Sequence, residues 1–94
     1  MTEPLTPEVA TTAIKALVKD GDISWSTHVR QEMLKDGFTT VDCLNVLRAG
    51  AVTESADFEG GTWRYRVHTN RMCVVVAFRS DTELRVITTW RKRR

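Results

Sequence analysis

The sequence predicts an α+β fold in which three N-terminal helices pack on one face of a four-stranded antiparallel sheet. Apolar residues recur at helical spacing through the first half of the chain, and three extended runs joined by short turns fill the last third. Ninety-four residues are enough for one modest hydrophobic core. Residues 1–94 are therefore assigned to a single domain that ends in a basic tail, residues 91–94.

Each predicted helix begins at a hydroxyl cap and ends at a glycine, the residue types that these positions favour. Proline in the first turn of the first helix and an acid three residues after the cap of the third strengthen the assignment. Residues 23–26 are expected only as a short extended approach to the second helix, which either Ser24 or Ser26 caps. The predicted helices cover about residues 7–19, 27–36 and 40–49, and they end at Gly21, Gly37 and Gly50.

Four strands are expected after the helices. A first strand over residues 51–57 leads, through a connection at residues 58–61, into three runs linked by short turns at residues 69–71 and 80–82. The middle run is apolar on both parities, which is typical of a central strand covered on both sides, whereas the outer two alternate. These three runs cover residues 62–69, 72–79 and 83–91, and they predict an antiparallel meander.

The alternating runs predict a basic face on the sheet, because successive side chains of a strand point to opposite faces. The aromatic residues Trp63, Tyr65 and Trp90 fall on the other parity, so they are assigned to the core or the sheet edge, with base stacking as the alternative. The basic side chains expected to share the exposed face, or to floor a groove on it, are Arg64, Arg66, His68, Arg79, Arg85 and Arg91.

Charge is divided unevenly along the chain. Residues 1–60 carry five Lys or Arg against ten Asp or Glu, and residues 61–94 carry nine against two, so we expect acidic helices and a basic sheet. Eight of those nine cations are arginine, whose planar guanidinium pairs with phosphate and stacks on bases. Binding of a polyanion is the prediction. The alternative is that the arginines are solvated residues that protect an exposed sheet face.

Several classes of protein are disfavoured by composition. The chain has no apolar run long enough to span a bilayer, and its N-terminus lacks a basic start followed by an apolar stretch, so a cytoplasmic protein without a membrane association is expected. Cys43 and Cys73 lie in apolar patterns and show no metal-binding spacing. We expect two reduced core thiols, no metal site and no cofactor.

A set of short motifs resembles a known superfamily. Residues 23–29 are similar to the I-x-F-S-x-H-A opening of small uncharacterised bacterial proteins in the RelE/MqsR-like toxin superfamily, and residues 86–90 resemble their closing V-I-T-V-Y strand. The resemblance covers roughly residues 23–90 in a consistent order. Between the two motifs it continues through Met33, Gly37, Phe38, Thr39, Asp42, Leu47 and Gly50.

This resemblance implies the architecture shared by barnase, EndoU, colicin and RelE type ribonucleases. It implies the toxin half of a toxin and antitoxin pair, a metal-independent endoribonuclease acting on messenger RNA, with an acidic antitoxin as its protein partner. The chain departs from the superfamily at two positions where relatives carry arginine, because it has Glu32 and Asp36 there.

Cleavage of RNA without a metal needs a base, an acid and cations that hold the charge on the phosphate. His68 beside Arg64 and Arg66 supplies these residue types on one strand face, and we expect His68, Arg66 and His28 to be catalytic. Arg64, Arg79, Arg85 and Arg91 are the expected RNA-binding residues. The alternatives are an exposed histidine at a strand end for His68, and a structural hydrogen bond for His28.

Three hypotheses follow from the sequence. The leading one is an RNA-cleaving toxin. The second is a module of the same fold that binds RNA or protein through its basic sheet face without cleaving. The third is a structural protein whose basic face meets an acidic partner.

Overall fold

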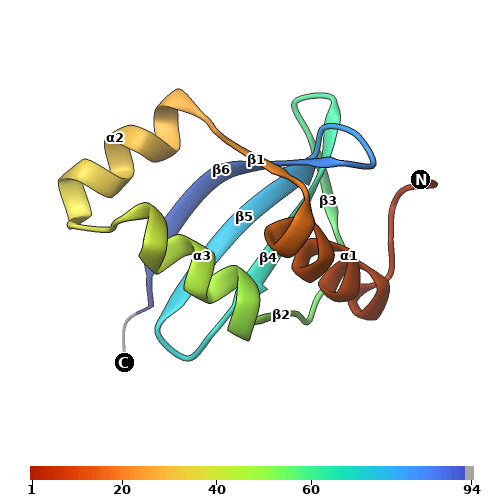
Figure 1. Cartoon of the computed structure of the whole chain (residues 1–94), viewed down its shortest axis with the longest axis horizontal. Helices are drawn as coiled ribbons and strands as arrows, with labels where there is room; N and C mark the ends of the chain where they lie inside the picture. The colour runs from red at the N-terminus through yellow and green to blue at the C-terminus, as the bar shows by residue number, and fades with distance from the viewer. Residues whose placement is uncertain (93–94) are drawn as a thin grey trace.

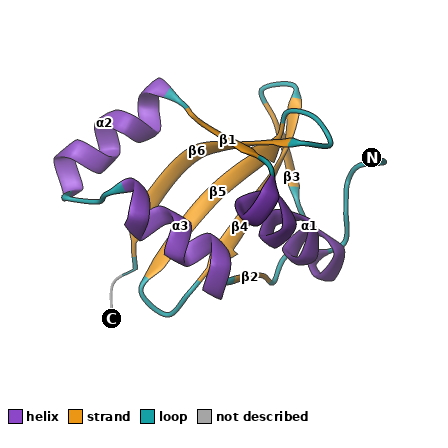
Figure 2. Cartoon of the chain, viewed as in Figure 1, coloured by secondary structure: helices purple, strands orange, loops and turns teal. Residues whose placement is uncertain are grey.

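A computed structural model describes residues 1–92, which form three helices over one face of a six-stranded sheet (Figure 1). Figure 2 separates the two layers, with α1 and α3 lying across the strands and α2 beyond them beside β6. The helices are α1 (Pro7–Asp20), α2 (Thr27–Asp36) and α3 (Thr40–Ala49). The strands are β1 (Asp22–Trp25), β2 (Ala51–Val52), β3 (Asp57–Glu59), β4 (Thr62–His68), β5 (Met72–Phe78) and β6 (Glu83–Arg91).

The α+β class and the three helices are confirmed, and the helices begin at the predicted caps. Thr6 accepts a hydrogen bond from the Val9 amide, and Thr39 and Asp42 form a reciprocal capping box. Gly37, with a φ of 73°, makes the tight turn between α2 and α3 that a residue with a Cβ would adopt only with strain.

The predicted four-stranded antiparallel sheet is wrong. The strand order is β1-β6-β5-β4-β2, with β3 also paired to β4, and β1 runs parallel to β6 while the other pairs are antiparallel. The predicted basic tail also differs, because Arg91 is the last residue of β6. Residues 93 and 94 of that tail lie outside the part of the chain that is described.

The segment expected as an extended approach forms the parallel edge strand β1. Its register pairs Asp22 with Glu83 and Trp25 with Val86. Four residues with a partner about sixty positions away give no local hairpin pattern, so periodicity and turn residues do not reveal the pairing.

The expected strand over residues 51–57 is two short strands on the same edge of β4. Ala51 lies opposite His68, and Asp57 lies opposite Arg64, so the segment between them bulges away from the sheet. The connection expected at residues 58–61 is instead the end of β3 and a two-residue turn. Gly60 and Gly61 have φ values of 60° and 81°, as a tight hairpin with positive φ at both central positions requires.

The core lies between the helices and the near face of the sheet. Ile14 of α1, Leu47 of α3, Tyr65 of β4 and Leu84 of β6 are each at most 1% exposed and belong to one apolar cluster. The far face of the sheet is left without a covering helix. This face is the location of the candidate site.

A β-bulge at Ile87 interrupts the alternation of β6. Val75 of β5 lies opposite Thr88, but the next residue, Val76, lies opposite Val86, so Ile87 has no partner in the ladder. Every side chain after the bulge therefore changes face relative to a regular strand.

The bulge reverses the predicted faces of the last residues of β6. Trp90, assigned to the core parity, lies on the far face in one row with Cys73 and His68 and is 40% exposed. Arg91 turns to the helix side, where its guanidinium carbon lies 4.6 Å from the centre of the Phe38 ring. Thr89 becomes a core residue, and its hydroxyl donates to the Cys73 carbonyl at 3.1 Å.

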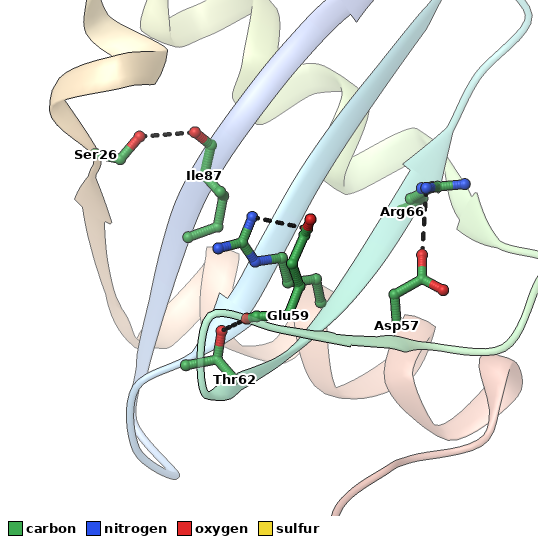
Figure 3. A network of polar contacts seen from close by, with 7 residues as sticks. Ser26, Asp57, Glu59, Thr62, Arg66 and Ile87 are labelled. Atoms are coloured by element: carbon green, nitrogen blue, oxygen red, sulfur yellow. Dashed lines mark hydrogen bonds and ion pairs between the residues drawn. The ribbon is translucent and has the colours of Figure 1, made fainter.

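Ser26 holds the bulge in place. Its hydroxyl donates to the Ile87 carbonyl at 2.7 Å (Figure 3) and accepts from the Val29 amide at 3.0 Å as the cap of α2. Its amide donates to the Val86 carbonyl at 3.0 Å. A single residue thus ends β1, starts α2 and satisfies the carbonyl that the bulge exposes.

Replacing Ser26 tests this arrangement. Ser26→Ala removes a helix cap and leaves the Ile87 carbonyl unsatisfied, so we expect a loss of about 2–4 kcal/mol in the free energy of unfolding. Thr39→Ala is the matched control, because it removes a cap with no tertiary bond and is expected to cost about 1 kcal/mol. Equal losses in urea unfolding would show that the bond to the bulge is unimportant.

The N-terminal arm, residues 1–6 before α1, covers the only tyrosine of the sequence. Tyr65 is fully buried; its hydroxyl donates to a Glu3 carboxylate oxygen at 2.8 Å and accepts from the Leu5 amide at 3.0 Å. Burial, together with the hydrogen bond to Glu3 and the charge of its carboxylate, raises the pKa of Tyr65 to about 12.

A single tyrosine makes this pKa directly measurable. Absorbance at the phenolate band is expected to rise with a midpoint near pH 12 in the native protein and near pH 10 in urea. The unfolded chain releases the proton first, so stability falls as the pH rises from 10 to 12. A native midpoint near 10 would contradict a buried, arm-covered hydroxyl.

Candidate functional site

The far face of the sheet carries the predicted row of basic residues. Arg64, Arg66 and His68 lie on the β4 parity opposite to the buried Tyr65 and Val67, which places the row on the uncovered face as predicted. Arg66 is exposed, Arg64 and His68 are half-buried, and β4 lies one strand from the centre of the sheet.

Each basic side chain of this row is paired with an acid from the neighbouring segment. Arg66 contacts Asp57 at 3.2 Å (Figure 3), and the other two pairs are Arg64 with Glu59 at 3.2 Å and His68 with Glu54 at 2.5 Å. Exposed ion pairs of this kind contribute little to stability. They do fix the direction of the arginine side chains. Asp57 uses one end of the Arg66 guanidinium, so the exposed Arg66 keeps N–H donors for a ligand.

The expectation of acidic helices and a basic sheet is therefore wrong in part. Three of the acids counted in the first half of the chain belong to the edge of the sheet, since β2, β3 and the segment between them run beside β4. The far face consequently presents alternating charges of both signs rather than a uniform positive field.

A small hollow lies on this face between the charged row and Trp90. Its volume is about 120 Å³, roughly that of four water molecules. Val75 and Thr88 form its floor, Trp90 lies on the β6 side, and the charged side chains lie on the β4 side. The complete lining is Asp57, Glu59, Arg64, Arg66, Val75, Thr88 and Trp90.

The pair of Glu54 and His68 provides the proton-transfer groups of the face. The hydrogen bond from His68 holds the pKa of Glu54 below its usual value, so Glu54 is a carboxylate at neutral pH. Because a carboxylate only accepts, the Nε2 atom of His68 carries the hydrogen of this bond. The Nδ1 atom is buried and has no partner among the described residues.

The other predicted site residues are dispersed. Arg85 is on the far face but near β1, where it lies 3.5 Å from the Ser24 hydroxyl. Arg79 follows β5 in an exposed hairpin turn, and Arg91 lies on the helix side beside Phe38. His28 is exposed on the first turn of α2, whose main sheet contact is β6. The structure therefore groups three of the seven predicted residues and separates the rest.

Sequence analysis missed Glu54, Asp57 and Glu59, and it gave base stacking by Trp90 only as the alternative to a core or sheet-edge position. A clue to two of them was present, because a Gly-Gly pair between extended runs is typical of a two-residue hairpin. That hairpin places Asp57 opposite Arg64 and puts Glu59 on the same face. Glu54 lies in an irregular segment and Trp90 follows a bulge, so no periodic pattern places either one.

Two features are absent from residues 1–92. No helix there is both long and apolar enough to cross a membrane. No three His, Cys, Asp or Glu side chains of those residues come together in a way that would hold a metal ion.

Comparison with known proteins identifies a family. Residues 25–91 match the model of DUF4258, a domain of unknown function. This chain belongs to that family. The matched part runs from the end of β1 to the end of β6, so it contains the Ser26 junction, the bulge and the far face of β2 to β6, while α1 precedes it.

No curated protein and no solved structure matches the chain. The DUF4258 match carries no activity, so the resemblance to RelE/MqsR-like toxins stays a prediction. Function must be argued from the site.

The thiol beneath the site offers a test of its geometry. Cys73 lies between His68 and Trp90 in the same cross-strand row and is fully buried, which raises its pKa to about 11. Burial likewise raises the pKa of Cys43. We expect neither thiol of the native protein to react with a disulfide reagent at pH 8, and both to react in urea. Rapid labelling of native Cys73 would show that the far face is open above it.

Proposed function

We propose that this DUF4258 domain is a metal-independent endoribonuclease that binds single-stranded RNA across the far face of its sheet. The observation that carries the proposal is the hydrogen-bonded pair of Glu54 and His68 beside Arg66, on a face that also exposes Trp90. A carboxylate, an imidazole, guanidinium groups and an aromatic ring are the residue types that this chemistry uses.

The reaction begins with attack of the ribose 2′-oxygen on the adjacent phosphorus atom. The 2′-hydroxyl proton passes to the pair of Glu54 and His68, entering at the Glu54 carboxylate, which is about half exposed. As the bond from phosphorus to the 5′-oxygen breaks, that oxygen takes a proton from water, and the hydroxide left behind removes the proton held by the pair. The products are a 2′,3′-cyclic phosphate and a free 5′-hydroxyl.

Arg66 is the proposed phosphate ligand of this step. It lies two residues from His68 on the same strand face, and such residues are about 6.5–7 Å apart, so both side chains reach one phosphate. Its bond to Asp57 uses one end of the guanidinium and leaves other N–H donors for phosphate oxygens. The pairing also keeps the side chain oriented before RNA arrives, which reduces the entropy lost on binding.

Trp90 is the proposed stacking surface for a base. It lies two strands from His68 in the same row, and neighbouring strands are about 4.8 Å apart, so the separation of roughly 10 Å suits a base and a phosphate of one strand of RNA. Stacking on an aromatic ring contributes about 1–3 kcal/mol per base.

A toxin role, a cytoplasmic location and an acidic antitoxin that covers the far face are part of the same proposal. They are supported by the resemblance of residues 23–29 and 86–90 to the RelE/MqsR-like superfamily. An acidic segment suits this face because it can replace Glu54, Asp57 and Glu59 as the partner of the basic row.

The second candidate is a binding module that holds RNA or protein without cleaving it. One observation favours it: every basic residue of the row is paired with an acid. This pairing lowers the positive potential that would stabilise the charge on a phosphate during cleavage. Direct assay of cleavage separates the two.

Incubation with a long unstructured RNA in chelator tests the proposal. The wild-type chain is expected to release fragments that end in 2′,3′-cyclic phosphate, and His68→Ala or Glu54→Gln to slow cleavage by about 100-fold or more while binding persists. Log affinity falls as log salt concentration rises. Arg66→Ala is expected to make this slope shallower by about 0.7, the value for one phosphate contact with a single strand.

Arg48→Ala is the matched control, because Arg48 is an exposed arginine on α3, on the opposite side of the sheet. It should change neither cleavage nor the salt slope. RNA that binds and stays intact would support the binding module, and RNA that does not bind at low salt would refute both candidates.

A further inference from the structure

The segment that carries Glu54 lies outside the ladder of the sheet. Residues 53–56 connect β2 to β3 and have no partner on β4. Glu54 nevertheless holds its carboxylate against His68, although the residue opposite His68 in the ladder is Ala51. The position of this carboxylate therefore depends on what fixes the backbone on either side of the segment.

The two ends of the segment are fixed to different degrees by the sheet. At one end, Asp57 lies opposite Arg64 in the pair of β3 and β4, and its carboxylate contacts Arg66. At the other end, β2 has only two residues, and just one of two adjacent antiparallel pairs exchanges hydrogen bonds. The sheet alone holds the β2 end weakly.

Helix α1, which lies beside β2 (Figure 2), anchors that end through Thr11. The Val52 amide donates to the Thr11 hydroxyl at 2.9 Å, and this hydroxyl donates to the Pro7 carbonyl one turn earlier at 2.8 Å. The second bond fixes the hydroxyl, so its oxygen stays available to β2 as an acceptor. Val52 is 5% exposed, so loss of the acceptor would leave a buried donor unsatisfied.

The N-terminal arm meets the same segment. Pro4 and Leu5 line a separate hollow of about 230 Å³ together with Ser55 and Ala56. Leu5 and Ala56 also pack against the core. The arm and α1 both precede residue 25, where the match to DUF4258 begins. The part of the chain before the family match thus contacts the segment that carries Glu54.

We propose that Thr11 is a positioning residue that holds Glu54 at hydrogen-bonding distance from His68. The Thr11 hydroxyl holds the Val52 amide, and Val52 is joined to Glu54 by two residues of backbone. The inference rests on the proposed function, because it concerns the group that takes the 2′-hydroxyl proton. Thr11 lies on the helix side of the sheet and acts only through β2.

The pKa of Glu54 reports its bond to His68 without any RNA. That bond is the main cause of the lowered pKa, and the charges of His68, Arg66 and Lys92 lower it further against the effect of burial. Thr11→Val keeps the shape of the side chain and removes the acceptor, so we expect the pKa of Glu54 to rise toward the ordinary glutamate value. A carbon NMR titration of the side-chain carboxyl group measures it, and Glu54→Gln assigns the signal.

Three variants serve as controls. Thr11→Ser keeps the hydroxyl and should keep the low pKa of Glu54. Thr12→Val is the matched control, because Thr12 is the exposed neighbour and its hydroxyl donates to the Glu8 carbonyl of its own helix. Thr39→Ala removes the cap of α3 and so lowers stability without changing β2. None of the three should raise the pKa of Glu54.

Hydrogen exchange gives a measurement that does not depend on the folding of a variant. In the wild-type protein, the Val52 amide is expected to exchange as slowly as the amides in the middle of α1, since the two open together. In Thr11→Val it should exchange about tenfold faster or more, as loss of a buried acceptor predicts. Exchange of the wild-type Val52 amide at the rate of an unprotected amide would overturn the anchor.

The outcomes separate this inference from the proposed function. If RNA is cleaved, Thr11→Val should lower kcat by about tenfold or more and leave KM unchanged, since Arg66 and Trp90 keep their positions. An unchanged Glu54 pKa in folded Thr11→Val, or an equal rise in Thr12→Val, would overturn the positioning role even if RNA is cleaved. A rise that is absent from Thr11→Ser would establish the role even if the domain leaves RNA intact.

Discussion

The hydrogen bond from the Ser26 hydroxyl to the Ile87 carbonyl is the constraint on which the far face depends. It joins the start of α2 to the one irregular point of β6, about sixty residues away. The bulge at Ile87 then decides which side of the sheet each later residue occupies. Without it, a regular β6 would bury Trp90 and turn Arg91 outward. The far face would lose its aromatic ring and the hollow beside it.

The bulge places polar groups where they need partners. Thr89 enters the core and is satisfied by the Cys73 carbonyl, and Arg91 turns to the helix side, where its side chain packs on Phe38. Arg91 stays largely exposed, so its charge keeps contact with water. These contacts explain why an insertion inside a nine-residue strand is tolerated, since each displaced group finds a suitable neighbour.

The electrostatics of the site follow from a second local feature, the Gly-Gly turn between β3 and β4. It folds an acidic segment back along the basic strand, so each cation of the row acquires a carboxylate. The result is a face with fixed, paired charges and little net field. Such a face favours ligands that carry both donors and acceptors over simple capture of any polyanion.

The sequence by itself determined the helices, their caps and the basic row on β4, because caps, glycines and period-two alternation act within a few residues of each other. Only the tertiary structure decided the parallel pairing of β1, the bulge in β6 and the position of Glu54 beside His68. Each of these joins segments across a long stretch of chain or through irregular backbone. Local patterns carry no information about such pairings, since packing of the whole domain selects them.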